Sequence, residues 1–160
     1  MILSNRKQKG NVTVEFAITG VVFFMILLGV LEVGRALFVW NVLEEVVRRG
    51  ARVAAVCQVD DTGVENIALF NDGAGNFLLP NFTTNNIKIT YLKADGTEAD
   101  TVTESDQIMF VKAEIENFTH ELLVPFVTWE INPSGMNVIL YRESLGIARP
   151  GATPTGFSTC

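Results

Sequence analysis

An uncharged apolar run at residues 16–31 constrains the fold of this chain more than any other feature. A transmembrane helix needs about 20 predominantly apolar residues to cross roughly 30 Å of hydrocarbon. Extending the helix through Glu32 and Arg35 to Trp40 supplies this length, and tryptophan is frequent at membrane interfaces. A buried helix of a soluble protein is the alternative, and the lack of a polar face along the run disfavours it. We therefore predict a transmembrane helix over residues 11–40.

The charges around this run predict its orientation. Arg6, Lys7 and Lys9 lie within residues 1–10, which contain no acidic residue. Positive charge before an apolar segment keeps that side in the cytoplasm, so the C-terminal part should lie outside it. No A-x-A-like pattern of small residues follows the run, so we expect the helix to stay with the chain.

Two opposite charges lie near the end of this helix. Glu32 and Arg35 are three residues apart and share a helix face. We predict that they form an intramembrane ion pair.

Beyond residue 40 the pattern becomes amphipathic. Apolar or small residues recur at steps of four and three, as on one face of a helix. They are Val39, Leu43, Val46, Gly50, Val53 and Cys57. No proline interrupts residues 11–57, so we predict one helix about 70 Å long, with residues 41–59 as its amphipathic continuation. Gly50 and Ala54 are small residues where another element can approach closely.

Residues 60–160 predict a small α+β domain. Residues 87–92, 107–116 and 136–143 read as strands, and the dipeptide Asp95-Gly96 is a strong hairpin signal. In the second strand, alternation points one set of side chains inward: Met109, Val111, Ala113 and Ile115. The segment 64–70 fits either helix or strand, and residues 120–127 read as a short helical turn. The expected class is α+β, with a small antiparallel sheet packed on the second half of the long helix, followed by an irregular tail from residue 146.

The two cysteines, Cys57 and Cys160, lack the spacing of a metal site. An oxidising compartment outside the cytoplasm favours a disulfide between them. The alternative is a buried Cys57 and an unpaired thiol at Cys160.

The sequence gives little support for chemistry. His120 is the single histidine, its neighbourhood suggests a surface residue, and no nucleophile stands in a recognisable context. No phosphate-binding glycine loop or cluster of metal ligands is present, so we predict neither a cofactor nor a small-molecule substrate. Eleven of the 18 acidic residues fall from Asp72 onward, and this acidic distal part disfavours nucleic acid as a partner.

Three segments, taken in order, resemble a known family. They are Gly10-Asn11-Val12-Thr13-Val14-Glu15-Phe16, Gly29-Val30-Leu31-Glu32-Val33-Gly34-Arg35 and Arg49-Gly50-Ala51-Arg52-Val53-Ala54-Ala55. The first resembles the class III signal of type IV pilins. Together, over residues 9–56, they resemble the TadE-like pseudopilins, which are minor pilins of the bacterial tight-adherence (Tad) pilus.

This resemblance implies a structural protein rather than an enzyme. A prepilin peptidase would remove residues 1–10 after Gly10, and the new amino terminus at Asn11 would be modified. Glu15, followed by Phe16, would act in assembly with other pilins and the Tad machinery. The protein would wait in the bacterial inner membrane and then enter the pilus, where it would take part in adhesion and surface attachment.

The role of Glu15 leaves two readings. Cleavage would create a positive amino group on Asn11 that can reach the Glu15 carboxylate of a neighbouring subunit. Alternatively, Glu15 extends its carboxylate to the lipid headgroups. Two other kinds of protein also remain open: a binding or sensing domain with an uncleaved anchor, and an envelope enzyme tethered by the helix.

Overall fold

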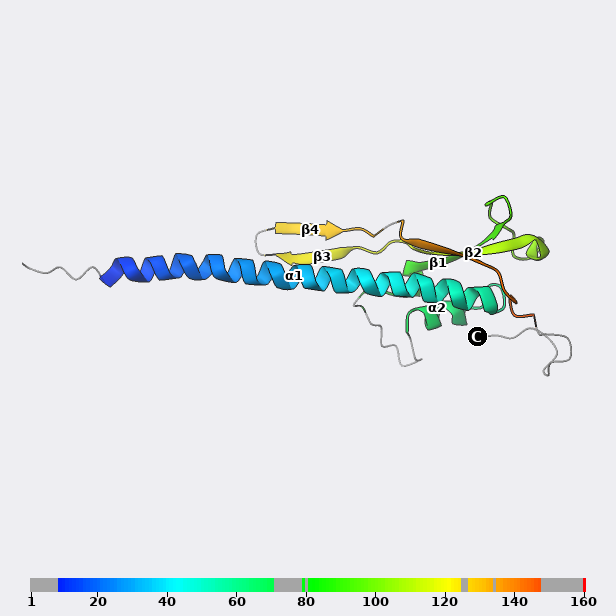
Figure 1. The fold of residues 1–160 in the computed structure, drawn as a ribbon, viewed down its shortest axis with the longest axis horizontal. Coiled ribbons are helices and arrows are strands. Elements are labelled where there is room, and N and C mark those ends of the chain that lie inside the picture. Colours follow the sequence, from blue (N-terminus) through cyan, green and yellow to red (C-terminus); the bar gives the residue numbers. More distant parts are fainter. Residues whose placement is uncertain (1–8, 71–78, 80, 125–126, 134, 148–159) are drawn as a thin grey trace, which may run out of the picture.

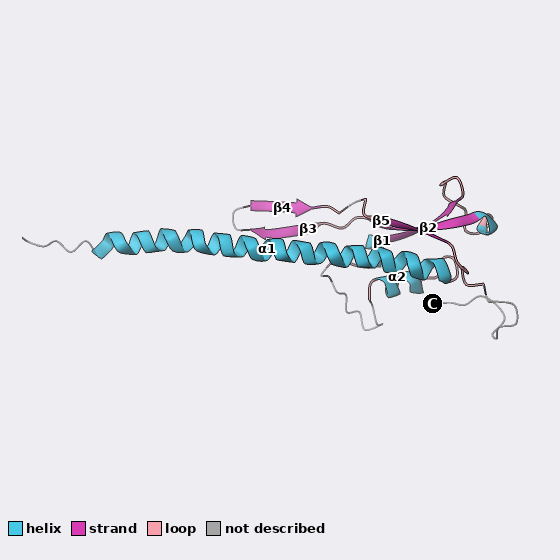
Figure 2. Cartoon of the chain, in the orientation of Figure 1, coloured by secondary structure: helices cyan, strands magenta, loops and turns pink. Residues whose placement is uncertain are grey.

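The fold consists of one long helix with a small β-rich domain beside its second half (Figures 1 and 2). The computed structural model describes residues 9–70, 79, 81–124, 127–133, 135–147 and 160. Helix α1, Lys9–Val56, is continuous over 48 residues, which corresponds to about 72 Å. The prediction of a single uninterrupted helix is confirmed, as is the α+β class with an antiparallel sheet packed on the helix.

Helix α1 ends three residues before the predicted limit of residue 59. It ends there because backbone N–H groups of residues 143–146 donate hydrogen bonds to its last carbonyls. The carbonyl of Ala55 accepts the backbone N–H of Glu143 at 3.0 Å, and the carbonyl of Val56 accepts the Gly146 N–H at 2.6 Å. These bonds satisfy groups that a helix end otherwise leaves open. Gly146 has a φ of +78° and lies against the Gln58 backbone, where a Cβ would come within 2.7 Å of the Gln58 Cα. Only glycine fits this crossing.

The predicted apolar stripe on α1 is confirmed and is wider than expected. Its buried members pack against the sheet and the second helix. They include Val39, Val42, Leu43, Val46, Val47, Ala51, Ala54, Ala55 and Cys57. Helix α2, Gly63–Ala68, settles the ambiguity of segment 64–70 in favour of a helix. At Gly50 the elements come closest, because an added Cβ would lie 2.9 Å from Ile87 Cδ1 and 3.3 Å from Ala68 Cβ.

The main sheet has three antiparallel strands in the order β1-β2-β5. Strand β1 is Ile87–Lys93, β2 is Ile108–Ile115 and β5 is Asn137–Tyr141, as the alternation predicted. Short 3₁₀ turns, Thr84–Asn86 and Ser105–Gln107, precede β1 and β2.

The inward set of β2 side chains was predicted wrongly at one position. Met109 is exposed, and Ile108 is fully buried in its place. The pairing shifts between Leu92 and Lys93, since Leu92 opposes Phe110 whereas Lys93 opposes Ile108. A bulge places one extra residue in a strand and thereby reverses the alternation beyond it.

A second sheet contains strands β3, His120–Val124, and β4, Val127–Ile131. The prediction of a helical turn over residues 120–127 is therefore wrong. Both strands pair antiparallel from His120↔Ile131 to Val124↔Val127, and the hairpin lies along the middle of α1 (Figure 1). The apolar and β-branched residues on both sides of Pro125 suit paired strands, and packing against α1 supplies the support that an isolated hairpin lacks.

A disulfide joins Cys57 to Cys160, with 5.8 Å between their Cα atoms and a sequence separation of 103. The disulfide that we predicted for an oxidising compartment is therefore present. The leader at residues 1–8, and residues 148–159 of the irregular tail, lie outside the described part of the chain.

Candidate functional site

The first half of α1 is exposed and almost entirely apolar. Its large side chains from Val12 to Val33 lie at the surface, among them Phe16, Phe23 and Leu31. Among the described residues, α1 is the one helix long and apolar enough to cross a membrane. This surface fits a membrane anchor, because exposed apolar patches of this size are rare on soluble monomers.

The residues predicted for processing and assembly lie at the start of this helix. Gly10 and Asn11 belong to its first turn. Glu15 and Phe16 are exposed, and the Thr19 hydroxyl donates a hydrogen bond to the Glu15 carbonyl at 2.9 Å. The roles of these four residues stay predictions.

Glu32 and Arg35 form an ion pair, whereas the predicted position of this pair inside the membrane stays a prediction. The Arg35 guanidinium donates to both carboxylate oxygens of Glu32, with 2.5 Å between Nη2 and Oε1 and 3.1 Å from Nε to each oxygen. Two parallel contacts of this kind are the stronger form of an arginine–carboxylate pair. Glu32 is only 8% exposed, whereas 40% of the Arg35 side chain remains accessible.

This pair also binds the edge of strand β3, which the sequence did not predict. The Leu123 N–H donates to Glu32 Oε1 at 2.9 Å, and Arg35 Nη2 donates to the Glu121 carbonyl at 2.5 Å. Both backbone groups point away from β4 and toward the helix. The two side chains therefore take the place of a neighbouring strand and satisfy groups that an edge strand leaves open. We call this contact, between Glu32, Arg35, Glu121 and Leu123, the edge clamp.

His120 lies beside the edge clamp and is buried, contrary to the predicted surface position. Its Nε2 has no hydrogen-bond partner among the described residues. Burial, together with the nearby positive charge of Arg35, lowers the pKa of His120 despite the opposing effect of Glu32. The neutral imidazole is therefore favoured in the folded state.

A half-open cleft of about 480 Å³ lies between α1 and the start of β3. Its lining is mixed. The apolar residues are Phe38, Val39, Leu79, Phe118 and Leu123, and the polar ones are Arg35, Asn81, Asn117, Thr119, His120 and Glu121. Among the described residues, no hydrogen bond joins the side chain of Thr119 or of Glu121 to His120.

The signal for this hairpin was available but weak. Pro125 and Phe126 separate two runs rich in leucine, valine, tryptophan and isoleucine, which is a pattern for paired strands. The contact between β3 and Glu32 could not be predicted from local sequence, because Leu123 and Glu32 are 91 residues apart.

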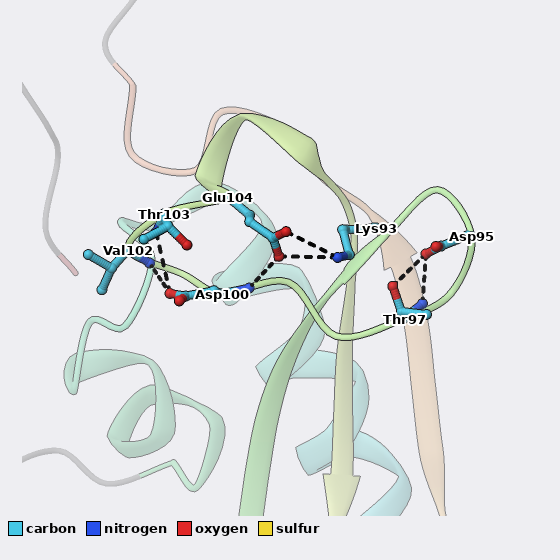
Figure 3. Close-up of polar contacts among 7 residues, drawn as sticks. All are labelled: Lys93, Asp95, Thr97, Asp100, Val102, Thr103 and Glu104. Carbon is cyan, nitrogen blue, oxygen red and sulfur yellow. Dashed lines mark hydrogen bonds and ion pairs between the residues drawn. The ribbon is translucent and has the colours of Figure 1, made fainter.

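The distal loop between β1 and β2 carries five acidic residues, and Figure 3 shows the contacts of three of them, Asp95, Asp100 and Glu104. The Asp95 carboxylate accepts the Thr97 hydroxyl at 2.7 Å and its N–H at 3.0 Å. Asp100 accepts the N–H groups of Val102 and Thr103, at 2.9 and 3.3 Å. These bonds to the charged form lower the pKa of both aspartates.

Glu104 closes the same loop. Its carboxylate accepts the Asp100 N–H at 3.1 Å and forms an ion pair with Lys93 at 3.1 Å. The carboxylates of Asp95, Asp100 and Glu104 thus bind groups of the loop itself or of strand β1. No group of histidine, cysteine, aspartate or glutamate suited to a metal ion occurs among the described residues.

Comparison with known proteins bears on the helix rather than on the distal domain. No curated protein and no solved structure matches the chain. The family model described as TadE-like protein matches residues 10–52, which covers the start of α1, the Glu32–Arg35 pair and Gly50. The resemblance to TadE-like proteins is therefore confirmed over residues 10–52 of this chain.

Proposed function

We propose that this protein is a minor pilin, or pseudopilin, of a Tad pilus and acts as a structural subunit rather than an enzyme. The observation that carries the proposal is a continuous helix whose TadE-like first half exposes an apolar surface, while its second half supports a folded domain. The same apolar surface suits both lipid and the packed helices of a filament. Transfer from membrane to pilus then need not expose it to water.

In this proposal a prepilin peptidase removes residues 1–10, and the protein waits in the bacterial inner membrane with its N-terminus in the cytoplasm. The distal domain lies outside the cytoplasm, where oxidising conditions support the Cys57–Cys160 bond. Other pilins and the Tad machinery then take up the helix, and the assembled pilus serves surface attachment.

Amino-terminal sequencing of the protein from its native membrane tests this proposal. The chain should begin at Asn11 when the peptidase is present and keep Met1–Gly10 when it is absent. Gly10→Leu should block removal of the leader. Gly20→Leu is the control: it makes the same change at a position where nothing lies within 4 Å, and the leader should still be removed. An unprocessed native protein would instead identify a binding or sensing domain on a permanent anchor.

A second arm tests assembly. Glu15→Val should still be inserted and cleaved but should enter pili poorly, because the partner for the new amino group is lost. Glu44→Val removes an exposed carboxylate from the amphipathic half and serves as the control. Full pilus formation with Glu15→Val would mean that Glu15 only reaches the headgroups.

A further inference from the structure

The β3–β4 hairpin runs along α1 toward the apolar half of the helix. At its first residue, His120 lies with Ala36, Val39 and Trp40 around a small cavity. Three residues later, the Leu123 N–H reaches Glu32. The strand therefore descends α1 from the folded domain to the point where the uncharged run ends (Figure 2).

The composition of the hairpin changes along the same direction. Near the domain, Glu121 opposes Glu130, and both side chains are exposed. At the other end the paired residues are apolar or uncharged: Leu122 with Trp129, Leu123 with Thr128, and Val124 with Val127. Leu123 is 73% exposed although it is a large apolar residue. A polar end followed by an apolar end is the pattern of an element that meets a lipid surface.

Backbone hydrogen bonding limits how deep the hairpin can lie. The edge clamp satisfies one side of β3, but the sheet holds only two strands, and no described strand pairs with the outer edge of β4. Open strand edges do not occur in hydrocarbon, where each unsatisfied group costs several kcal/mol. The hairpin can therefore meet the headgroup region, but the open outer edge of β4 cannot lie in the hydrocarbon.

Helix length gives the same limit independently. Residues 12–31 rise by about 30 Å, which equals the usual hydrocarbon thickness. Glu32 is the next residue, and it is the residue to which the hairpin is attached.

We propose that the β3–β4 hairpin rests on the outer surface of the membrane, with Leu123 in the lipid headgroup region, and that the edge clamp sets the depth of α1. The membrane-spanning part is then residues 12–31. Trp40 lies about 12 Å farther along the helix and above the lipid, rather than at the predicted boundary of residue 40. This inference rests on the membrane anchoring of α1 in the proposed function.

The test uses the full chain in phospholipid nanodiscs at one copy per disc, with methyl-labelled leucine and valine. Nitroxide lipids, labelled either at the headgroup or near the end of the acyl chain, broaden the signals of groups that lie at the same depth. We expect headgroup nitroxide to broaden the Leu123 methyl signals several-fold more than those of Val102, which is 85% exposed in the distal loop.

Leu27, in the uncharged run, serves as the control for insertion. If the acyl-chain nitroxide leaves Leu27 unaffected, the helix is not inserted and the anchor itself is wrong. If Leu27 is broadened but Leu123 behaves like Val102, the hairpin does not meet the lipid and this inference alone is overturned.

Discussion

Removing the Glu32 carboxylate should detach the β3–β4 hairpin while leaving the main sheet folded. Glu32→Ala leaves two groups without their acceptor, the Leu123 N–H and the Arg35 guanidinium. The main sheet is held by a separate set of contacts with the second half of α1. We therefore expect a local opening rather than a lower stability of the whole protein.

The size of the effect follows from the two lost interactions. A hydrogen bond to a charged acceptor contributes about 1.5 to 3 kcal/mol. The ion pair adds little, about 0.2 to 1 kcal/mol, because 40% of the Arg35 side chain is accessible to solvent. A total of about 2 to 4 kcal/mol corresponds to an opening equilibrium about 30 to 700 times more favourable. Glu32→Gln keeps an oxygen acceptor for Leu123 and should have roughly half the effect in kcal/mol.

Hydrogen exchange of the Leu123 amide measures this opening directly, because that N–H is the one donated to Glu32. The protein is kept in nanodiscs, and exchange at Val111 in the main sheet is recorded as an internal reference. Glu44→Ala is the matched control, since it removes a glutamate from a more exposed pair with Arg48 at 3.7 Å. An unchanged Leu123 rate in Glu32→Ala, or an equal increase in Glu44→Ala, would refute the edge clamp as the attachment of the hairpin.

Three further predictions concern the domain. Gly50→Leu should lower the free energy of unfolding by about 1 to 3 kcal/mol in denaturant titrations, because Ala68 and Ile87 already fill the space, whereas Gly34→Leu, with nothing within 4 Å, should not. Replacing both Cys57 and Cys160 by alanine should cost up to about 4.7 kcal/mol on the chain-entropy model for a loop of about 100 residues, and reduction of the native protein should match it. The pKa of His120, measured by NMR titration, should lie below its ordinary value of about 6.5, since burial and Arg35 disfavour the charged form and Glu32 offsets them only in part. On the facing strand β4, Glu130 is the one residue that titrates. A folded pKa below the unfolded one means that hairpin docking is stable above about pH 6.5 and weakens as pH falls through the folded pKa. The protection of the Leu123 amide, relative to its intrinsic exchange rate at each pH, should therefore decrease there; a pKa at or above about 6.5 would contradict this.

The long helix and the main sheet were predictable because their signals are local and periodic. Helix α1 is evident from local sequence alone. Its two signals are the uncharged residues 16–31 and the apolar stripe from Val39 to Cys57. Alternation likewise predicted β1, β2 and β5. The error at Met109 arose where a bulge, visible only in the pairing of Leu92 and Lys93, broke that period.

The candidate site was predictable only in part, because its second half comes from a distant segment. The spacing of Glu32 and Arg35 sufficed to predict their pairing, since residues three apart share a helix face. Nothing in that spacing indicates that Leu123 and Glu121 complete the arrangement. The burial of His120 follows from the same docking, so it was misjudged for the same reason.

The edge clamp satisfies two groups that would each be unfavourable alone near a membrane: the Glu32 carboxylate and the open edge of β3. A carboxylate next to an apolar run is costly if left unpaired, and an open strand edge near a membrane is costly for the same reason, loss of water as a hydrogen-bonding partner. In this protein the carboxylate of Glu32 and the edge of β3 satisfy each other, while Arg35 balances the charge. The two needs are met at one level of the helix, immediately after the uncharged run ends. The position of the domain along α1 and the end of the apolar segment are therefore coupled, and a shift of Glu32 by even one residue would rotate it by about 100° away from Leu123.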